Sequence, residues 1–170
     1  MLTLRVTSLD GTRAVAAAVA GLARSGDVIV LSGEMGAGKT AFAQGFGAAL
    51  GVDGPMTSPT YTLVHSYEVG RLTLHHADLY RLDTHHQVAD LGLSELVEDD
   101  GILLVEWGDP VAASLGDHLH VALAHDTDLD DDSDPDGMPP SSRTITVTGV
   151  GRAWAPRWDR LCTALEALSC

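Results

Sequence analysis

Hydrophobic residues follow two periods along this chain, and together they predict alternating strands and helices. Leu2–Thr7 alternates apolar and polar side chains, as a half-buried strand does. Asp27–Leu31 and Ile102–Trp107 are compact apolar runs, which are typical of strands buried on both faces of a parallel sheet. Asp10–Ser25 and Lys39–Leu50 predict helices, and a glycine follows the end of each.

The rest of the pattern completes an α/β arrangement. Gly70-Arg71 separates two runs that read as the strands of a hairpin. The further predicted elements are the hairpin strands Tyr61–Glu68 and Leu72–Asp78, the helix Thr84–Asp99, the strands His118–Ala124 and Thr144–Thr148, and the helix Trp158–Leu168. We therefore expect three layers, with a mainly parallel central sheet, antiparallel additions and helices on both sides.

The segment Asp126–Ser142 interrupts this pattern, because it is rich in Asp, Ser and Pro and has almost no large apolar residue. Such a composition buries too little apolar surface to fold, so we predict a disordered acidic loop inside a single domain of residues 1–170. Its dense aspartates also suggest a calcium site as an alternative. The segment lacks the EF-hand spacing of glycine and glutamate, which favours a solvated loop.

The chain is strongly acidic. Its formal charge is −14, from 24 acidic and 10 basic residues. Seven of the acidic residues lie in Asp126–Asp136, which leaves 17 acidic against 10 basic residues elsewhere. A protein of this charge repels phosphate backbones, so we expect any contact with nucleic acid to run through a partner.

Several features favour a cytoplasmic protein. No apolar run reaches the roughly 20 residues that span a bilayer. Ala14–Ala23 resembles the core of a secretion signal, but cleavage there would leave the strand before the glycine loop as the new N-terminus. Cys162 and Cys170 lack metal-ligand spacing and are typical of free thiols in a reducing compartment.

The strongest chemical signal is a glycine loop. Gly33–Thr40 (GEMGAGKT) matches the phosphate-binding pattern G-x-x-x-x-G-K-[ST] at every fixed position. Gly36 and Gly38 let backbone N–H groups approach phosphate oxygens without Cβ clashes. We expect Lys39 to reach the β- and γ-phosphates, the Thr40 hydroxyl to ligate Mg²⁺, and the following helix to direct its positive end at the anion.

The predicted strand before this loop and the helix after it argue against a chance match and favour a P-loop NTPase-like fold. We expect ATP to contact every residue of the loop: Gly33, Glu34, Met35, Gly36, Ala37, Gly38, Lys39 and Thr40.

Three further positions could complete the site around the phosphates. Thr60 could bring a hydroxyl to the metal or the γ-phosphate. Alternatively, its only role could be to stabilise the turn of the TSPT loop. Asp78 ends a predicted strand, where it could ligate Mg²⁺ or cap a helix. Glu106 closes a very apolar strand, where a carboxylate is costly to bury unless it is used. It could hold the metal, orient the attacking water, or lie at the surface.

We expect the catalytic groups to be Lys39, Asp78 and Glu106, and the metal ligands to be Thr40, Asp78 and Glu106. The histidine pairs His75-His76 and His85-His86 predict no zinc site, because adjacent residues of a strand point to opposite faces. We expect surface or core roles for these histidines.

Four segments together resemble the bacterial TsaE (YjeE) proteins, in the order and spacing of that family. They are Gly33–Thr40 (GEMGAGKT), Thr57–Val64 (TSPTYTLV), His76–Leu82 (HADLYRL) and Leu104–Trp107 (LVEW). Many families share the glycine loop, whereas the other three segments together are far more specific. The resemblance extends from about Thr12 to Gly151, outside the acidic loop.

The resemblance implies an ATPase, with ATP and Mg²⁺ as cofactors, that acts with TsaB and TsaD in threonylcarbamoyladenosine modification of tRNA beside the anticodon. The sequence shows no obvious arginine finger, so we expect weak hydrolysis alone and stimulation by these partners, and the acidic charge leaves contact with tRNA to them. The resemblance places Thr60 in a switch-like loop, Asp78 at a Walker-B-like position and Glu106 at the metal or water site. It also implies that Arg143 contacts the nucleotide and that Leu9–Thr12 approaches the adenine.

The sequence departs from the family in two places, and two other functions stay open. Ala41 stands where a second Thr is common, and the acidic loop is an insertion. A P-loop small-molecule kinase is one alternative, although Arg71, Arg81 and Arg143 are thin support for the arginine-rich lid of such enzymes. The other is a scaffold whose bound ATP orders the TSPT loop without catalysis. A GTPase is disfavoured, because no guanine-reading N/T-K-x-D segment is present.

Overall fold

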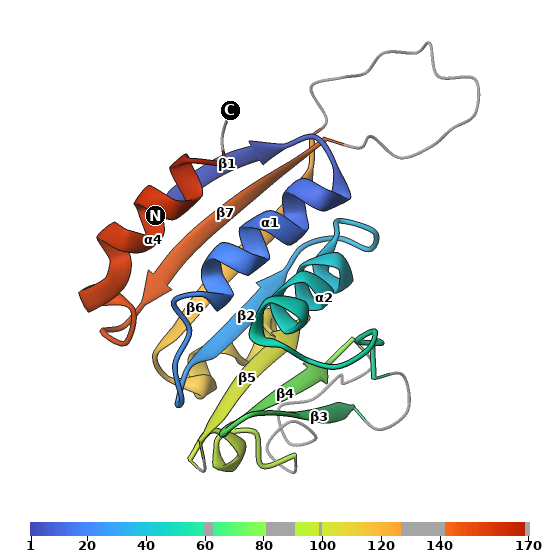
Figure 1. The fold of residues 1–170 in the computed structure, drawn as a ribbon, viewed down its shortest axis with the longest axis vertical. Coiled ribbons are helices and arrows are strands. Elements are labelled where there is room, and N and C mark those ends of the chain that lie inside the picture. The colour runs from blue at the N-terminus through green and yellow to red at the C-terminus, as the bar shows by residue number, and fades with distance from the viewer. Residues whose placement is uncertain (60–62, 81–90, 99, 127–141, 169–170) are drawn as a thin grey trace.

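The computed structural model describes residues 1–59, 63–80, 91–98, 100–126 and 142–168. Seven strands within them form one sheet, in the order β1-β7-β6-β2-β5-β4-β3 (Figure 1). The strands are β1 (Leu2–Val6), β2 (Val28–Ser32), β3 (Val64–Val69), β4 (Leu72–Asp78), β5 (Gly101–Glu106), β6 (His118–His125) and β7 (Arg143–Val150).

The middle of the sheet is parallel and its two sides are antiparallel. β2 lies between β5 and β6 and runs parallel to both, and β4 runs parallel to β5. β3 and β4 form an antiparallel hairpin at one side, and β7 pairs antiparallel with β6 and β1 at the other. This topology confirms the α/β class and the mainly parallel centre with antiparallel additions.

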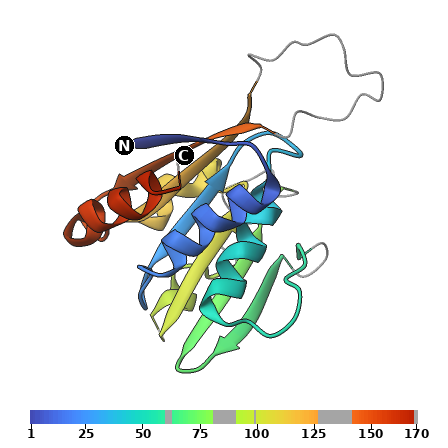
Figure 2. The same cartoon turned by 45° about the horizontal axis from the view of Figure 1, so that its top comes forward.

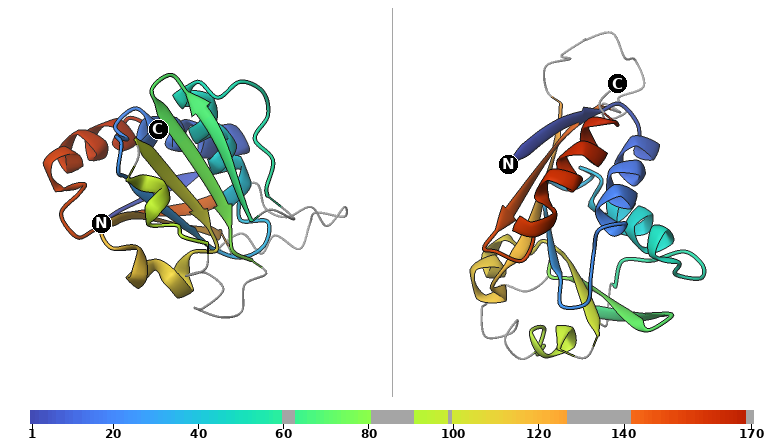
Figure 3. Two further views of the ribbon diagram at one scale, coloured as in Figure 1. Left: turned by 90° about the horizontal axis from the view of Figure 1, so that it is seen from below. Right: turned by 60° about the vertical axis from the view of Figure 1, so that its left-hand side comes forward.

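Three helices of the described residues cover one face of the sheet: α1 (Leu9–Ala20), α2 (Lys39–Leu50) and α4 (Trp158–Glu166) (Figures 2 and 3). Alternate residues of β2 serve the two faces, as the strand period requires. Ile29 and Leu31 join the cluster under the helices, whereas Val28 and Val30 join a second cluster on the opposite face. In the described part of the chain, that opposite face carries the 3₁₀ segments η1 (Glu95–Val97) and η2 (Asp109–Leu115).

A buried ion pair links the C-terminal helical region to the residue that precedes β2. A third 3₁₀ segment, η3 (Ala155–Arg157), leads into α4. Arg157 forms an ion pair with Asp27, and both side chains are almost fully buried. The Arg157 guanidinium also donates to the backbone oxygen of Leu22 and lies over the Trp154 ring. These contacts hold α4 on the same side of the sheet as α1.

Most predicted elements lie close to their predicted positions, and α2 has the predicted bounds. The first helix begins at Leu9 because the Ser8 hydroxyl accepts a hydrogen bond from the Gly11 amide and caps it. The predicted helix Thr84–Asp99 falls partly outside the described residues. Within 91–98 that prediction is wrong, because the chain forms turns and η1, and Gly92 has a left-handed φ of 59°.

Residues 127–141 of the predicted acidic loop lie outside the described residues. The residues that flank this segment are bound to each other. The Asp126 amide donates to the Ser142 carbonyl over 3.2 Å, and the Ser142 hydroxyl donates to the Asp126 carboxylate over 3.1 Å. Arg5 completes this link through an ion pair with Asp126. Among the described residues, no helix is both long and apolar enough to cross a bilayer.

Candidate functional site

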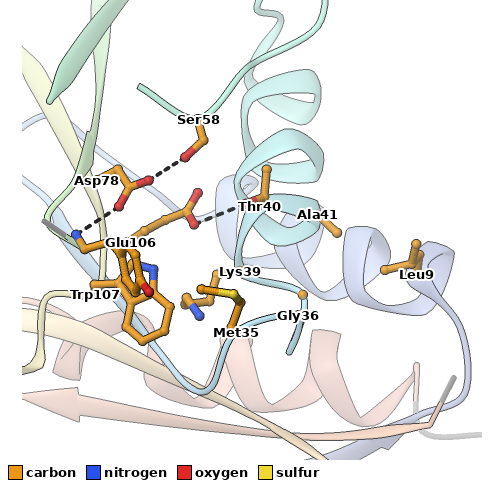
Figure 4. A pocket seen from close by; sticks show the side chains of 12 residues that line it. Leu9, Met35, Gly36, Lys39, Thr40, Ala41, Ser58, Asp78, Glu106 and Trp107 are labelled. Carbon is orange, nitrogen blue, oxygen red and sulfur yellow. Dashed lines mark hydrogen bonds between the residues drawn. The ribbon is translucent and has the colours of Figure 1, made fainter. Parts of the chain in front are cut away.

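Three parallel strands deliver polar groups to one edge of the sheet. β2 ends where the glycine loop begins, β4 ends at Asp78, and β5 ends at Glu106. The register pairs Asp78 with Glu106, so the two carboxylates lie side by side. The loop then enters α2 at Lys39. A pocket of about 370 Å³ opens between these elements, and its wall extends from both carboxylates to Leu9 of α1 (Figure 4).

The backbone of the glycine loop needs glycine at both ends. Gly33 has a φ of 131°, and a Cβ there would lie 2.0 Å from the carbonyl oxygen of Leu123 on β6. Gly38 precedes α2 with a φ of 107°, a left-handed conformation that L side chains rarely adopt. The first glycine therefore allows a close crossing of β6, and the second turns the chain into the helix.

The amino end of α2 has no side-chain cap. Its N-cap residue is Gly38, which makes no capping hydrogen bond through a side chain. The first N–H groups of a helix have no intrahelical partner, and the helix dipole makes this end positive. Because the pocket is lined by Gly38, Lys39, Thr40 and Ala41, this end of α2 faces the cavity. The arrangement suits a phosphate group.

Lys39 is the only lysine of the chain, and its side chain is folded against the loop. Its ammonium group donates to the carbonyl oxygens of Gly33 and Glu34, over 2.7 Å and 2.8 Å. The same group lies 3.6 Å from the centre of the Trp107 ring. Burial lowers the pKa of Lys39, and the negative charges of Glu106, Asp78 and Asp109 oppose this shift, in that order.

Trp107 covers Lys39 from a strained backbone position. Its φ is 61°, which is rare for a bulky residue. The Trp107 amide donates to the carbonyl of Leu31 over 3.0 Å, which fixes the turn that follows β5. Its ring also packs against Tyr80, with ring centres 4.9 Å apart. Both aromatic side chains line the pocket, and Trp107 lies beside Lys39 (Figure 4).

Glu106 is buried and uses both of its oxygens. Only 2% of the residue is exposed. Oε2 accepts a hydrogen bond from the Thr40 hydroxyl over 3.2 Å, and Oε1 lies 2.9 Å from Nε2 of His76. A buried carboxylate without partners would be strongly unfavourable. These two contacts therefore explain why a glutamate is tolerated at the end of an apolar strand.

Asp78 is half-buried beside Glu106 and binds the loop that precedes β3. Its Oδ2 accepts a hydrogen bond from the Ser58 hydroxyl over 2.5 Å, and its Oδ1 accepts one from the Tyr80 amide over 3.1 Å. Ser58 belongs to the TSPT segment, whose last residue, Thr60, lies outside the described residues. The hydrogen bond between Ser58 and Asp78 therefore links the TSPT segment to the carboxylates of the site.

Arg143 lies against the glycine loop and is not part of the pocket wall. The residue is 5% exposed, and its Nη1 donates to the Thr12 hydroxyl over 3.1 Å. A Cβ at Gly38 would lie 3.4 Å from the same nitrogen. Burial lowers the pKa of Arg143. In this position the guanidinium supports the turn into α2 from α1 and β7.

The chain matches known proteins over most of its length. The family model described as "Threonylcarbamoyl adenosine biosynthesis protein TsaE" matches residues 6–133. The chain belongs to the TsaE family.

Relatives named tRNA threonylcarbamoyladenosine biosynthesis protein TsaE are similar over most of both chains. The protein from Bacillus subtilis is 34% identical over 163 residues, which cover 95% of this chain and 92% of that protein. The protein from Streptomyces coelicolor is 38% identical over 140 residues, covering 81% and 89% of the two chains. A crystal structure of Bacillus subtilis YdiB has a TM-score of 0.70, with 32% identity, and covers 98% of this chain and 94% of that one.

The oxygen donors of this TsaE-family site fit Mg²⁺. The described residues contain no group of three or more His, Cys, Asp or Glu side chains arranged to hold a metal ion. Mg²⁺ does not require such a cage, because it commonly binds through one or two carboxylates, waters and substrate phosphates. The adjoining Thr40 hydroxyl and Glu106 carboxylate supply this chemistry, with Asp78 beside them.

Two contacts of the site were not predicted from the sequence. His76 was expected to have a surface or core role, and the structure buries it; its partner, Glu106, was not predicted. Strand parity carried the signal, since His76 and Asp78 are two residues apart and share a face. Trp107 was singled out only through the family resemblance, and its contact with Lys39 depends on a left-handed turn that no local pattern indicates.

Proposed function

We propose that this chain is the Mg²⁺-dependent ATPase subunit of a tRNA threonylcarbamoyladenosine-modifying complex, and that it acts with TsaB and TsaD. One observation carries the ATPase proposal. The loop lysine, the Thr40 hydroxyl and the Glu106 carboxylate converge at the uncapped end of α2, within one pocket. The lysine suits a phosphate, and the two oxygen donors suit the magnesium ion that accompanies it. The family and the names of its members support the role in tRNA modification.

In this proposal the chain's own groups divide the work. The loop amides and the Lys39 ammonium bind the β- and γ-phosphates. Thr40 and Glu106 hold Mg²⁺, which when bound neutralises charge on the phosphates. Asp78 is the more exposed of the two carboxylates, and it orients the water that attacks the γ-phosphate in line with the leaving oxygen. Trp107 and Tyr80 exclude other water from the same pocket.

The charge of the chain supports the indirect role of tRNA. With a formal charge of −14, the chain repels a phosphate backbone at long range. TsaB and TsaD therefore provide the tRNA contact in this account, and the ATPase acts on them.

A reconstituted modification assay separates an ATPase from a scaffold. Wild type, Lys39→Ala and Glu106→Ala are each combined with TsaB, TsaD, ATP, a threonylcarbamoyl donor and unmodified tRNA, and threonylcarbamoyladenosine is measured. Glu68→Ala is a matched control, because it removes an exposed glutamate on β3. Loss of modification with both site variants, but not with the control, supports the ATPase. Full modification by a Glu106→Ala protein that no longer hydrolyses ATP would establish the scaffold instead.

A further inference from the structure

His76 lies at a buried position of β4, where the packing of the strand does not require a polar side chain. On β4, Leu74, His76 and Asp78 share the face covered by α2, where Leu74 joins the apolar cluster. An apolar residue would fit this sequence of buried positions, since His76 is 0% exposed. β4 instead has an imidazole at this position, two residues before Asp78, which pairs with Glu106 on β5.

The His76 imidazole contacts the carboxylate of Glu106, which also accepts a hydrogen bond from Thr40 in the first turn of α2. In the parallel register, His76 lies opposite Leu104, two residues before Glu106. Its Nε2 reaches diagonally to Oε1 of Glu106, at 2.9 Å, while Oε2 of the same carboxylate accepts from Thr40. The His76 and Glu106 side chains are 1% and 3% exposed, so solvent does not compete for this contact.

The second ring nitrogen decides which tautomer fits. Nδ1 of His76 is buried and has no hydrogen-bond partner among the described residues. A proton on Nδ1 alone would leave a buried N–H unpaired and would set the Nε2 lone pair against a carboxylate oxygen. A proton on Nε2 makes a donor for Oε1 and leaves only a weak acceptor without a partner.

We infer that His76 is a positioning residue, which donates from Nε2 to Oε1 of Glu106 and thereby holds Oε2 toward the Thr40 hydroxyl and the magnesium position. This inference rests on the proposed function, because it assigns His76 a task at the same Mg²⁺–nucleotide site. Partners that orient a metal ligand commonly affect metal affinity by about 10–100-fold. Without the histidine, the carboxylate is free to rotate away from Thr40.

The test compares two amides of different reach. The amide nitrogen of Gln approximates the position of Nε2, whereas that of Asn lies near Nδ1 and is too short to reach Glu106. Binding of a non-hydrolysable ATP analogue is measured by calorimetry over a range of Mg²⁺ concentrations and in chelator. We expect His76→Asn to need about 10–100-fold more Mg²⁺ than wild type for the same nucleotide affinity. Affinity in chelator should be unchanged, and His76→Gln should stay close to wild type.

His75→Asn is the matched control, because it makes the same change one residue earlier on the opposite face, where His75 contacts Ser66. It should leave the Mg²⁺ requirement unchanged. A folded His76→Asn protein with the wild-type Mg²⁺ requirement overturns the inference and leaves the proposed function standing. A wild-type chain whose nucleotide binding ignores Mg²⁺ overturns both.

A second measurement needs no variant. Long-range ¹H–¹⁵N spectra of the wild-type chain report which nitrogen of the His76 ring carries the proton. We expect a proton on Nε2 and a bare Nδ1. A neutral ring protonated on Nδ1 would overturn the inference, even if His76→Asn fails to fold.

Discussion

The Thr40 hydroxyl donates a hydrogen bond to Oε2 of Glu106 over 3.2 Å, and this contact joins the first turn of α2 to the last residue of β5. The two residues are 66 positions apart in the sequence. Their contact brings the two oxygen donors that we assign to Mg²⁺ within reach of one ion, beside the glycine loop.

The first prediction concerns this hydroxyl. Thr40→Val keeps the shape of the side chain but removes the oxygen, so it should raise the Mg²⁺ concentration needed for tight ATP binding. Thr40→Ser keeps the oxygen and should retain the wild-type requirement. Calorimetric titration of an ATP analogue at several Mg²⁺ concentrations measures both variants. Equal requirements for valine and serine would remove Thr40 from the set of metal ligands.

The second prediction concerns the single lysine. Hydrogen bonds to charged groups contribute about 1.5–3 kcal/mol, so Lys39→Met should weaken ATP binding by roughly 10–100-fold. Arg71→Met is the control for net charge, because it removes one exposed cation at the β3–β4 turn. Equilibrium binding of a labelled ATP analogue measures both. Similar losses in the two variants would mean that long-range charge, rather than contact with phosphate, explains the effect.

The third prediction concerns the loop backbone. Gly33→Ala places a Cβ 2.0 Å from the Leu123 carbonyl oxygen at a φ of 131°. Gly26→Ala also places alanine at a positive φ, 86°, but its Cβ meets nothing within 4 Å. The second change should cost about 1–2 kcal/mol from backbone strain alone. Gly33→Ala should cost more, and each further kcal/mol lowers the melting temperature by about 2–4 °C. Equal melting temperatures of the two variants would contradict the close crossing of β6.

The fourth prediction concerns His75. Burial lowers the pKa of His75, and a hydrogen bond with the Leu96 backbone partly opposes this shift. Below the ordinary histidine pKa of about 6.5, the unfolded chain therefore binds a proton that the folded chain resists. The free energy of unfolding should fall as the pH drops through this value, until the folded-state pKa is passed.

Replacing His75 by Gln removes this titration. Urea unfolding of wild type and His75→Gln between neutral and mildly acidic pH should show a shallower pH dependence for the variant. Parallel pH profiles would show that His75 does not contribute to the pH dependence of the free energy of unfolding.

Local patterns predicted the framework of the site better than its contacts. The period of apolar residues placed β2, α2, β4 and β5 within a few residues of their observed bounds. The fixed spacing of the glycine loop then placed Lys39 and Thr40 at the start of α2. Such features depend on neighbours in the sequence, which is why they can be recognised from it.

The contacts between distant segments could not be predicted in this way. Glu106 meets Thr40 and His76 only because β5 lies between β2 and β4 in the sheet. That strand order comes from tertiary packing and not from local pattern. The helix predicted at Thr84–Asp99 is the clearest error of local pattern, because residues 91–98 form turns and η1, and Gly92 has a left-handed φ.

Steady-state ATP hydrolysis tests the central claim most directly. The purified chain is assayed alone and with TsaB and TsaD, with Glu106→Ala measured under the same conditions. We expect slow, Mg²⁺-dependent hydrolysis by the chain alone, a clear increase when both partners are present, and loss of both rates in the variant. Equal turnover with and without the partners, or undiminished turnover by Glu106→Ala, would contradict a partner-stimulated ATPase whose metal site is built on Glu106.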